Sequence, residues 1–219
     1  MLLMLPLPAL AIPAITCHCF TDRSFDPAHP TVADPYFLAT TQNSFFAAAF
    51  GVEKRAIVVE KQKGVSGDDL WVAYWLATRS GADPDALLQE RKSKGSWRQV
   101  ALPLPISTSR KDRVAAALKT TTTDERLAMA VVDELLLRFR FHNEAELAAL
   151  RKAGAGNQEL VIAAVIAAKT RQPAIQLYRE VKGGKTSWGA LLQRAKIEPG
   201  EIQAVVTAMV TGTNGSKSK

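Results

Sequence analysis

The sequence predicts an all-α protein made of two tandem, duplicated small helical bundles that pack together and follow an extended N-terminal arm. Three observations lead to this prediction. Apolar residues recur at helical spacing between residues that commonly begin or end helices. A pattern of residues returns about ninety positions later in the chain. The 219 residues are 47% hydrophobic and 22% charged, which is typical of a folded chain and excludes a disordered polyelectrolyte.

The repeat extends over most of the chain. Five residues recur ninety positions later, namely Asp34, Gly64, Leu70, Ala73 and Ala77 as Asp124, Gly154, Leu160, Ala163 and Ala167. Pro84 recurs as Pro173 after eighty-nine positions, and Lys94, Ser96, Trp97 and Ile106 recur as Lys185, Ser187, Trp188 and Ile197 after ninety-one. Any two amphipathic stretches can be aligned in some way, but here the order holds with only small gaps. The sequence therefore predicts one duplication of a small helical domain.

The predicted organisation has six parts. They are an apolar, signal-like segment (1–16), an extended arm (17–33), helical repeat 1 (34–106), a basic linker (107–123), helical repeat 2 (124–211) and a disordered tail (212–219). A repeat of this size is near the lower limit for a stable core of its own. We therefore expect the two repeats to pack against each other.

Helix-capping signals define the elements of repeat 1. Asp34 and Pro35 predict the N-cap and first residue of a helix that ends near Gly51. A second helix, 53–63, is predicted to stop at Gly64. The fourth and fifth helices are predicted to begin at Asp83-Pro84 and Ser96-Trp97, with Gly95 between them.

The third helix of repeat 1 begins with two acids and continues with the most aromatic segment of the chain. Asp68 and Asp69 invite an acid–base interpretation, but carboxylates at a helix start also satisfy free amides and oppose the helix dipole. The segment 70–76 has apolar residues nearly all round, which predicts a buried helix. Stacking on bases or sugars is the functional alternative for its aromatic residues.

Repeat 2 follows the same plan. Helices are predicted from Asp124 to about Phe141, from Asn143 to Gly154, over 158–169, from Pro173 to Gly183, from Ser187-Trp188 onward, and from Pro199 to about Thr211. The helix over 158–169 has small and branched residues where repeat 1 has aromatic ones. A helix core tolerates that exchange, whereas an aromatic binding platform does not.

The N-terminal segment suggests export. Residues 1–16 carry no charge and are almost wholly apolar. Three prolines interrupt the segment, and it is shorter than the ~20 residues that span a bilayer, so we expect no transmembrane protein. It resembles the apolar region of a secretion signal, although the usual basic residues before it are missing. Export to the periplasm or cell envelope is the expectation; a buried segment of a cytoplasmic protein is the alternative.

Cys17, His18 and Cys19 are adjacent and include both cysteines of the chain. Cys17 could carry a lipid, although residues 14–16 match the usual small-residue signal poorly. Thiolates and an imidazole could bind a soft metal, with His29 as the nearest fourth ligand. The two cysteines could instead form a disulfide with each other or with a partner. No cofactor is expected apart from a metal at this triplet.

The net charge of +7 is concentrated in two stretches. Residues 90–119 contain eight Lys or Arg and two acids, and residues 151–196 contain nine and two. Such a field favours an anionic partner, although an exposed basic surface also serves solubility alone. The candidate binding residues are Lys92, Lys94, Arg98, Arg110, Lys111, Arg113, Lys182, Lys185, Arg194 and Lys196.

No catalytic motif is recognisable. The three histidines lie at unrelated positions, and the chain has neither a nucleophile elbow nor a glycine-rich phosphate loop. The acids considered, Asp68, Asp69, Asp133 and Glu134, all have helix-surface or capping explanations. We therefore expect a non-enzymatic protein.

The order Gly, Leu in an Ala-rich helix, Pro, Gly-x-Ser-Trp and Ile resembles short helical repeats of uncharacterised exported bacterial proteins. The start CHCFTDRSFDPAHPTVADPYFLATTQNSFF is similar to the N-terminal part of one such group. The resemblance covers most of the chain and implies an all-helical, exported protein. It implies no catalytic residues.

Two functions are compatible with these observations. The first is an exported helical-repeat protein that binds another protein or an acidic surface. The second is nucleic-acid binding, because residues 187–197 and the helix after Pro199 have helix-turn-helix proportions. That second helix offers few polar side chains to base edges, and Pro103 and Pro105 interrupt the corresponding turn in repeat 1. Binding to a protein or acidic surface is therefore the preferred prediction.

Overall fold

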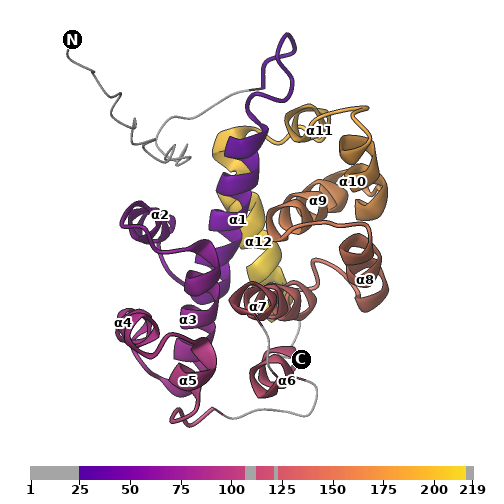
Figure 1. The fold of residues 1–219 in the computed structure, drawn as a ribbon. Helices are drawn as coiled ribbons and strands as arrows, with labels where there is room; N and C mark the ends of the chain where they lie inside the picture. The colour runs from indigo at the N-terminus through magenta and orange to yellow at the C-terminus, as the bar shows by residue number, and fades with distance from the viewer. Residues whose placement is uncertain (1–24, 107–111, 121–122, 216–219) are drawn as a thin grey trace, which may run out of the picture.

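The computed structural model describes residues 25–106, 112–120 and 123–215, and every regular element in these ranges is a helix (Figure 1). The all-α prediction is confirmed. The helices are α1 (Asp34–Phe50), α2 (Lys54–Gln62), α3 (Gly67–Ser80), α4 (Pro84–Lys94), α5 (Trp97–Ala101), α6 (Arg113–Lys119), α7 (Asp124–Arg138), α8 (Glu144–Lys152), α9 (Asn157–Thr170), α10 (Ala174–Lys182), α11 (Trp188–Arg194) and α12 (Ile202–Gly215), with a short 3-10 helix η1 (Pro199–Glu201) before α12.

Side-chain caps explain most of the helix starts. Ser66, Asp83, Ser96, Asn143 and Ser187 each accept a hydrogen bond from a backbone N–H in the first turn of the following helix. These bonds replace partners that the first amides of a helix lack. Asp68 and Asp69 lie in the first turn of α3, which Ser66 caps in this way.

The helices of the two halves follow the same order. α8 and α9 begin and end ninety positions after α2 and α3, and α7 begins ninety positions after α1. Ser96 and Ser187 cap α5 and α11, and Trp97 and Trp188, the first residues of these helices, are both buried. The glycine before Ser-Trp is not at a constant distance, since Gly95 adjoins Ser96 whereas Gly184 lies three residues before Ser187. The duplication stays a prediction.

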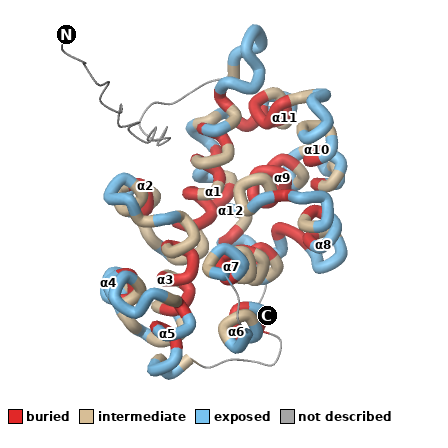
Figure 2. Tube along the Cα trace, in the orientation of Figure 1, coloured by how far each residue is buried: buried red, intermediate tan, exposed pale blue. Residues whose placement is uncertain are grey.

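The first helix of each half packs against the other half, so the two halves do not form separate bundles. α1 packs mainly against α9 and α12 of the second half, whereas α7 packs mainly against α3 and α6 of the first half. The buried apolar residues of both halves belong to one continuous core. Figure 2 shows buried residues on α1, α3 and α9 near the centre of the molecule, and α7 packs against both α3 and α9. The expected division into a bundle at 34–106 and another at 124–211 therefore does not describe the packing.

An aromatic cluster joins the halves at this centre. The ring of Phe45 in α1 lies 4.8 Å from that of Phe141, which follows α7, and 6.0 Å from that of Trp71 in α3. Trp71 and Trp75 are 2% exposed. The aromatic residues of α3 are therefore mainly core residues, and most of their surface is not available to stack on a ligand.

Asp34 does not cap its own helix as predicted. Ala33 is the N-cap of α1, and the Asp34 carboxylate accepts hydrogen bonds from the backbone N–H groups of Trp188 (3.1 Å) and Gly189 (2.9 Å). The carboxylate therefore satisfies the first amides of α11, 154 residues further along the chain. Burial raises the pKa of Asp34, and the two N–H donors oppose this increase. The bond ties α1 to the second half.

The segment predicted to be a basic linker contains a packed helix. Val114 and Ala115 of α6 are buried, and α6 lies against α7 (Figure 1). Asp112 caps α6 by accepting a hydrogen bond from the Ala115 N–H. α6 follows α5 and packs on α7, as α12 follows α11 and packs on α1. An apolar run of only a few residues gives a weak helical signal, so the sequence suggested a linker here.

The two ends of the described chain also differ from expectation. Residues 25–33 form a series of turns rather than an extended arm. α12 continues to Gly215, so residues 212–215 are helical although a disordered tail was predicted from 212. No helix of the described residues is long and apolar enough to cross a membrane.

Candidate ligand-binding groove

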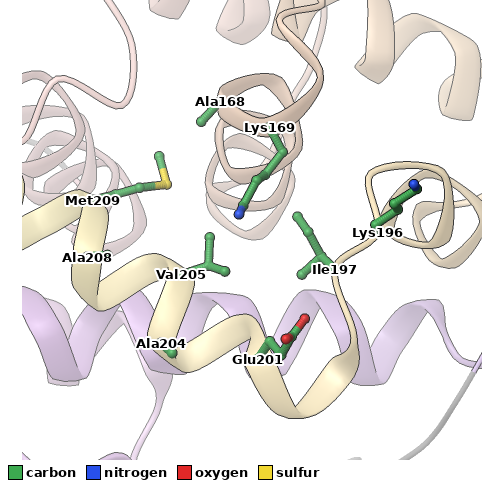
Figure 3. Close-up of a pocket in the computed structure, with 9 residues that line it drawn as sticks. All are labelled: Ala168, Lys169, Lys196, Ile197, Glu201, Ala204, Val205, Ala208 and Met209. Carbon is green, nitrogen blue, oxygen red and sulfur yellow. The ribbon is translucent and has the colours of Figure 1, made fainter.

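An open groove lies between the C-terminal part of α9, the connection from α11 to η1, and α12 (Figure 3). Its volume is about 540 Å³, within the range of small-molecule sites. The residues that line it are Ala168, Lys169, Lys196, Ile197, Glu201, Ala204, Val205, Ala208 and Met209. Because most of these side chains are apolar and three are charged, the groove can accommodate a ligand with both characters.

The apolar floor of the groove comes from Ile197, Val205 and Met209. Ile197 is 3% exposed, and Val205 and Met209 are partly buried against the core. α12 presents Val205 and Met209 because it buries Ile202, Val206 and Val210 against the core, which leaves the adjacent helical face toward the groove, and Ile197 comes from the connection between α11 and η1. These side chains can cover an aliphatic or aromatic group.

Two lysines supply positive charge. Figure 3 shows the Lys169 side chain extending from α9 into the groove, whereas the Lys196 ammonium lies at the rim and points outward. Lys196 has a positive φ of 54° and occupies the turn after α11. The Glu201 carboxylate is engaged locally, since it accepts a hydrogen bond from the Glu198 N–H at 3.1 Å. No ion pair of Lys169 or Lys196 occurs within the described parts of the chain.

The predicted binding residues do not form one surface. Lys92, Lys94 and Arg98 lie on α4 and α5, whereas Lys182, Lys185, Arg194 and Lys196 lie on or beside α10 and α11. Figure 1 shows these two pairs of helices at opposite ends of the molecule. Arg113 pairs with Glu144, Lys94 with Glu90 and Arg194 with Glu180. Arg110 and Lys111 lie outside the described residues.

Of the ten predicted binding residues, Lys196 alone lines the groove, and sequence reasoning missed Lys169. Lys169 belongs to the second basic stretch, but at the end of an Ala-rich helix it carries no motif. The sequence also did not show that Ile197 and Val205 form the floor of the groove, because it does not indicate which side of α12 faces α9. The counterpart of Lys169 in the first half, Arg79, is the one signal that could have marked it.

Three of the four acids considered for catalysis, Asp69, Asp133 and Glu134, have structural partners. Asp69 accepts a hydrogen bond from the indole N–H of Trp97 at 2.8 Å, and its backbone N–H donates to the cap residue Ser66. Asp133 accepts hydrogen bonds from Arg151, with donor–acceptor distances of 2.6 and 3.0 Å. These contacts explain both carboxylates without a reaction.

Glu134 belongs to a partly buried group of charges around Arg79. The Arg79 guanidinium donates to Glu134 Oε1 at 2.7 Å and lies 3.6 Å from Asp112 Oδ2. The Asp112 side chain is 2% exposed, and its Oδ2 and the Oε2 of Glu134 are buried without a hydrogen-bond donor in the described chain. Burial raises the pKa of Glu134, Asp112 adds to the increase, and Arg79 opposes it. A proton on Glu134 would supply the missing donor.

His142 is held inside the second half. Its Nε2 is 2.9 Å from the Leu160 carbonyl oxygen and its Nδ1 is 3.1 Å from Glu146 Oε2. The histidine side chain is 0% exposed, so it serves packing rather than surface chemistry. The described residues contain no group of three or more His, Cys, Asp or Glu that could hold a metal ion. The proposed ligands Cys17, His18 and Cys19 lie outside these residues.

No protein-family model, curated protein or solved structure matches the chain. The resemblance to exported bacterial helical-repeat proteins therefore stays an expectation.

Proposed function

We propose that the chain is a non-catalytic binding protein and that its ligand is an anion with an apolar part. One observation carries this proposal: a groove with an apolar floor has a lysine ammonium extending into it and a second lysine at its rim. An ammonium beside an apolar surface favours a ligand that offers a negative charge and a hydrophobic group together. We keep the predicted preference for an anionic partner, but we propose that the partner binds in the groove rather than at the exposed helix ends.

Binding to nucleic acid remains the alternative, with less support. In the helix-turn-helix interpretation α12 would enter the major groove of DNA. It carries no Lys or Arg between Ile202 and Gly215 and uses one face to pack on α1. Lys and Arg supply most of the electrostatic affinity for DNA phosphates, so a helix of this composition would bind DNA weakly.

The test uses 8-anilinonaphthalene-1-sulfonate, an apolar anion that fluoresces when it leaves water. The full chain is expected to bind it saturably, and the double variant Lys169→Ala with Lys196→Ala to bind it about fivefold more weakly or worse, since a nearby unit charge contributes ~1 kcal/mol even in water. The matched control is Lys92→Ala with Lys185→Ala, which removes two exposed lysines elsewhere and should bind as the wild type. Circular dichroism verifies that every variant is folded. Equal affinity of both double variants would refute the proposal.

Export is proposed separately and rests on the apolar residues 1–16. The test is the intact mass of the native protein recovered from fractionated host cells. A mature chain beginning near Cys17 outside the cytoplasm is the expected result. The same mass reveals a lipid, a disulfide or, under native conditions, a bound metal. A full-length chain confined to the cytoplasm would contradict export.

A further inference from the structure

The two halves place a cation at corresponding positions but surround it differently. Arg79 is the penultimate residue of α3 and Lys169 is the penultimate residue of α9, ninety positions later. Arg79 lies beside Asp112 at the start of α6, and Lys169 lies beside α12. α6 and α12 occupy corresponding places in the chain, because α6 follows α5 and α12 follows α11. The environment of Arg79 therefore indicates what the environment of Lys169 could bind.

Arg79 is neutralised by carboxylates from within the chain, namely Glu134 of α7 and Asp112 before α6. The counterpart of Glu134 on α1 is Ser44, whose hydroxyl donates to the Thr40 carbonyl oxygen at 2.8 Å. The counterpart of Asp112, the residue before α6, is Glu201, the residue before α12, and the Glu201 carboxylate accepts a hydrogen bond from the Glu198 N–H at 3.1 Å. Lys169 thus has no carboxylate opposite it on α1, it forms no ion pair with Glu201 in the described chain, and a groove is open beside it.

The charges at the groove specify one negative charge on the ligand. Lys169 and Lys196 carry two positive charges and Glu201 one negative charge, so the lining has a net charge of +1. A monoanion balances this charge, whereas a phosphate monoester brings about two negative charges at neutral pH.

The floor specifies the remainder of the ligand. Ile197, Val205 and Met209 provide branched and thioether side chains without a hydroxyl or amide group. Met adapts to irregular apolar shapes, so a flexible aliphatic chain can pack against this surface. A sugar or a nucleotide base would leave its hydrogen-bonding groups without partners here.

We infer that the groove binds a free monocarboxylate with an aliphatic tail. Its carboxylate contacts Lys169 as Glu134 contacts Arg79, and its tail lies on Ile197, Val205 and Met209. This inference rests on the proposed function, and it narrows the anion to one chemical class.

The test is calorimetric titration of the full chain with octanoate. One molecule is expected to bind per chain, and octylammonium and acetate are expected to bind at least about tenfold more weakly, because one has the wrong charge and the other has no tail. Octyl phosphate is expected to bind no more tightly than octanoate. Octylammonium binding as tightly as octanoate, or octyl phosphate binding more tightly, would overturn the inference.

A pair of variants tests the location of the carboxylate. Ala204→Asp adds a carboxylate at a position of α12 that lines the groove together with Lys169, and it should weaken octanoate binding about tenfold or more. Thr207→Asp adds the same charge to an exposed position of α12 that does not line the groove, and it should leave the affinity within about twofold of wild type. An equal effect of the two substitutions would overturn the inference.

The two proposals fail in distinguishable ways. If the anilinonaphthalene sulfonate binds through Lys169 and Lys196 but octanoate does not bind, the aliphatic carboxylate is wrong and the anion-binding groove stands. If neither probe depends on these lysines, both proposals are wrong.

Discussion

At the scale of single residues, Gly189 shows how closely the two halves approach each other. A Cβ atom on Gly189 in α11 would lie 2.8 Å from ring carbons of both Phe25 and Phe37. Cβ atoms essentially never approach other carbon atoms this closely, so the rings or α11 would have to move. The absence of a side chain therefore lets α11 rest on α1 at the point where Asp34 caps it.

We predict that Gly189→Ala lowers the free energy of unfolding by about 1–3 kcal/mol, the usual cost of overpacking. The control is Gly200→Ala, because nothing lies within 4 Å of a Cβ at Gly200. Urea denaturation of the two variants gives the comparison. Similar stabilities of the two variants would contradict the close packing of α11 on Phe37.

The raised pKa of Glu134 predicts that the stability of the folded chain depends on pH. Its pKa is raised in the folded chain, chiefly by burial, so the folded state holds this proton more tightly than the unfolded state. This contribution to stability is present at low pH and is lost as the pH rises through the folded pKa, which lies above the ordinary value of 4.5. Glu134→Gln cannot lose a proton and should gain stability relative to wild type between pH 4 and pH 7, as measured by urea denaturation. Parallel profiles of the two proteins would contradict the raised pKa.

At the scale of elements, the sequence located most helices and misjudged a few. Caps such as Ser96, Asn143 and Ser187 are local signals, and the structure has them at the predicted helix starts. The role of Asp34 could not be predicted, because its partner amides lie 154 and 155 residues away. Its carboxylate next to Pro35 has the pattern of an ordinary N-cap, and only the tertiary packing assigns it to α11.

The helix α6 is the element that the sequence described least well. Val114 is fully buried, whereas Lys119 in the same helix is exposed. We predict that Val114→Ala costs about 2 kcal/mol of stability, from the lost burial of two methyl groups and the cavity they leave. Lys119→Ala should change the stability by less than about 0.5 kcal/mol. Thermal unfolding gives the comparison, and equal effects would mean that α6 is a detached linker.

At the scale of the whole molecule, the main feature that could not be predicted from the sequence is that α1 packs on the second half and α7 on the first. The repeat predicted equivalent helices, but the same pattern is compatible with each first helix packing on its own half. The apolar residues of α1 do not specify whether α3 or α9 covers them. The groove has the same origin, because it forms where α9, α11 and α12 meet and depends on the placement of all three.

Because α1 is covered by α9 and α12, half of the chain should not fold alone. Residues 1–106 would expose the faces of α1 and α3 that now pack on the second half. We predict that this fragment has little helix and no cooperative unfolding transition, and that mixing it with residues 107–219 restores both. Circular dichroism with thermal melting measures this. A cooperative transition of the isolated fragment would show two independent bundles.

The most direct test of the binding account is chemical-shift mapping by NMR of the uniformly labelled full chain during titration with octanoate. The resonances of Lys169, Ile197, Val205, Ala208 and Met209 should move together and saturate with one affinity, while those of α4 and α5 should stay in place. Shifts centred on the basic ends of the molecule, or no saturable shifts in the groove, would contradict the account.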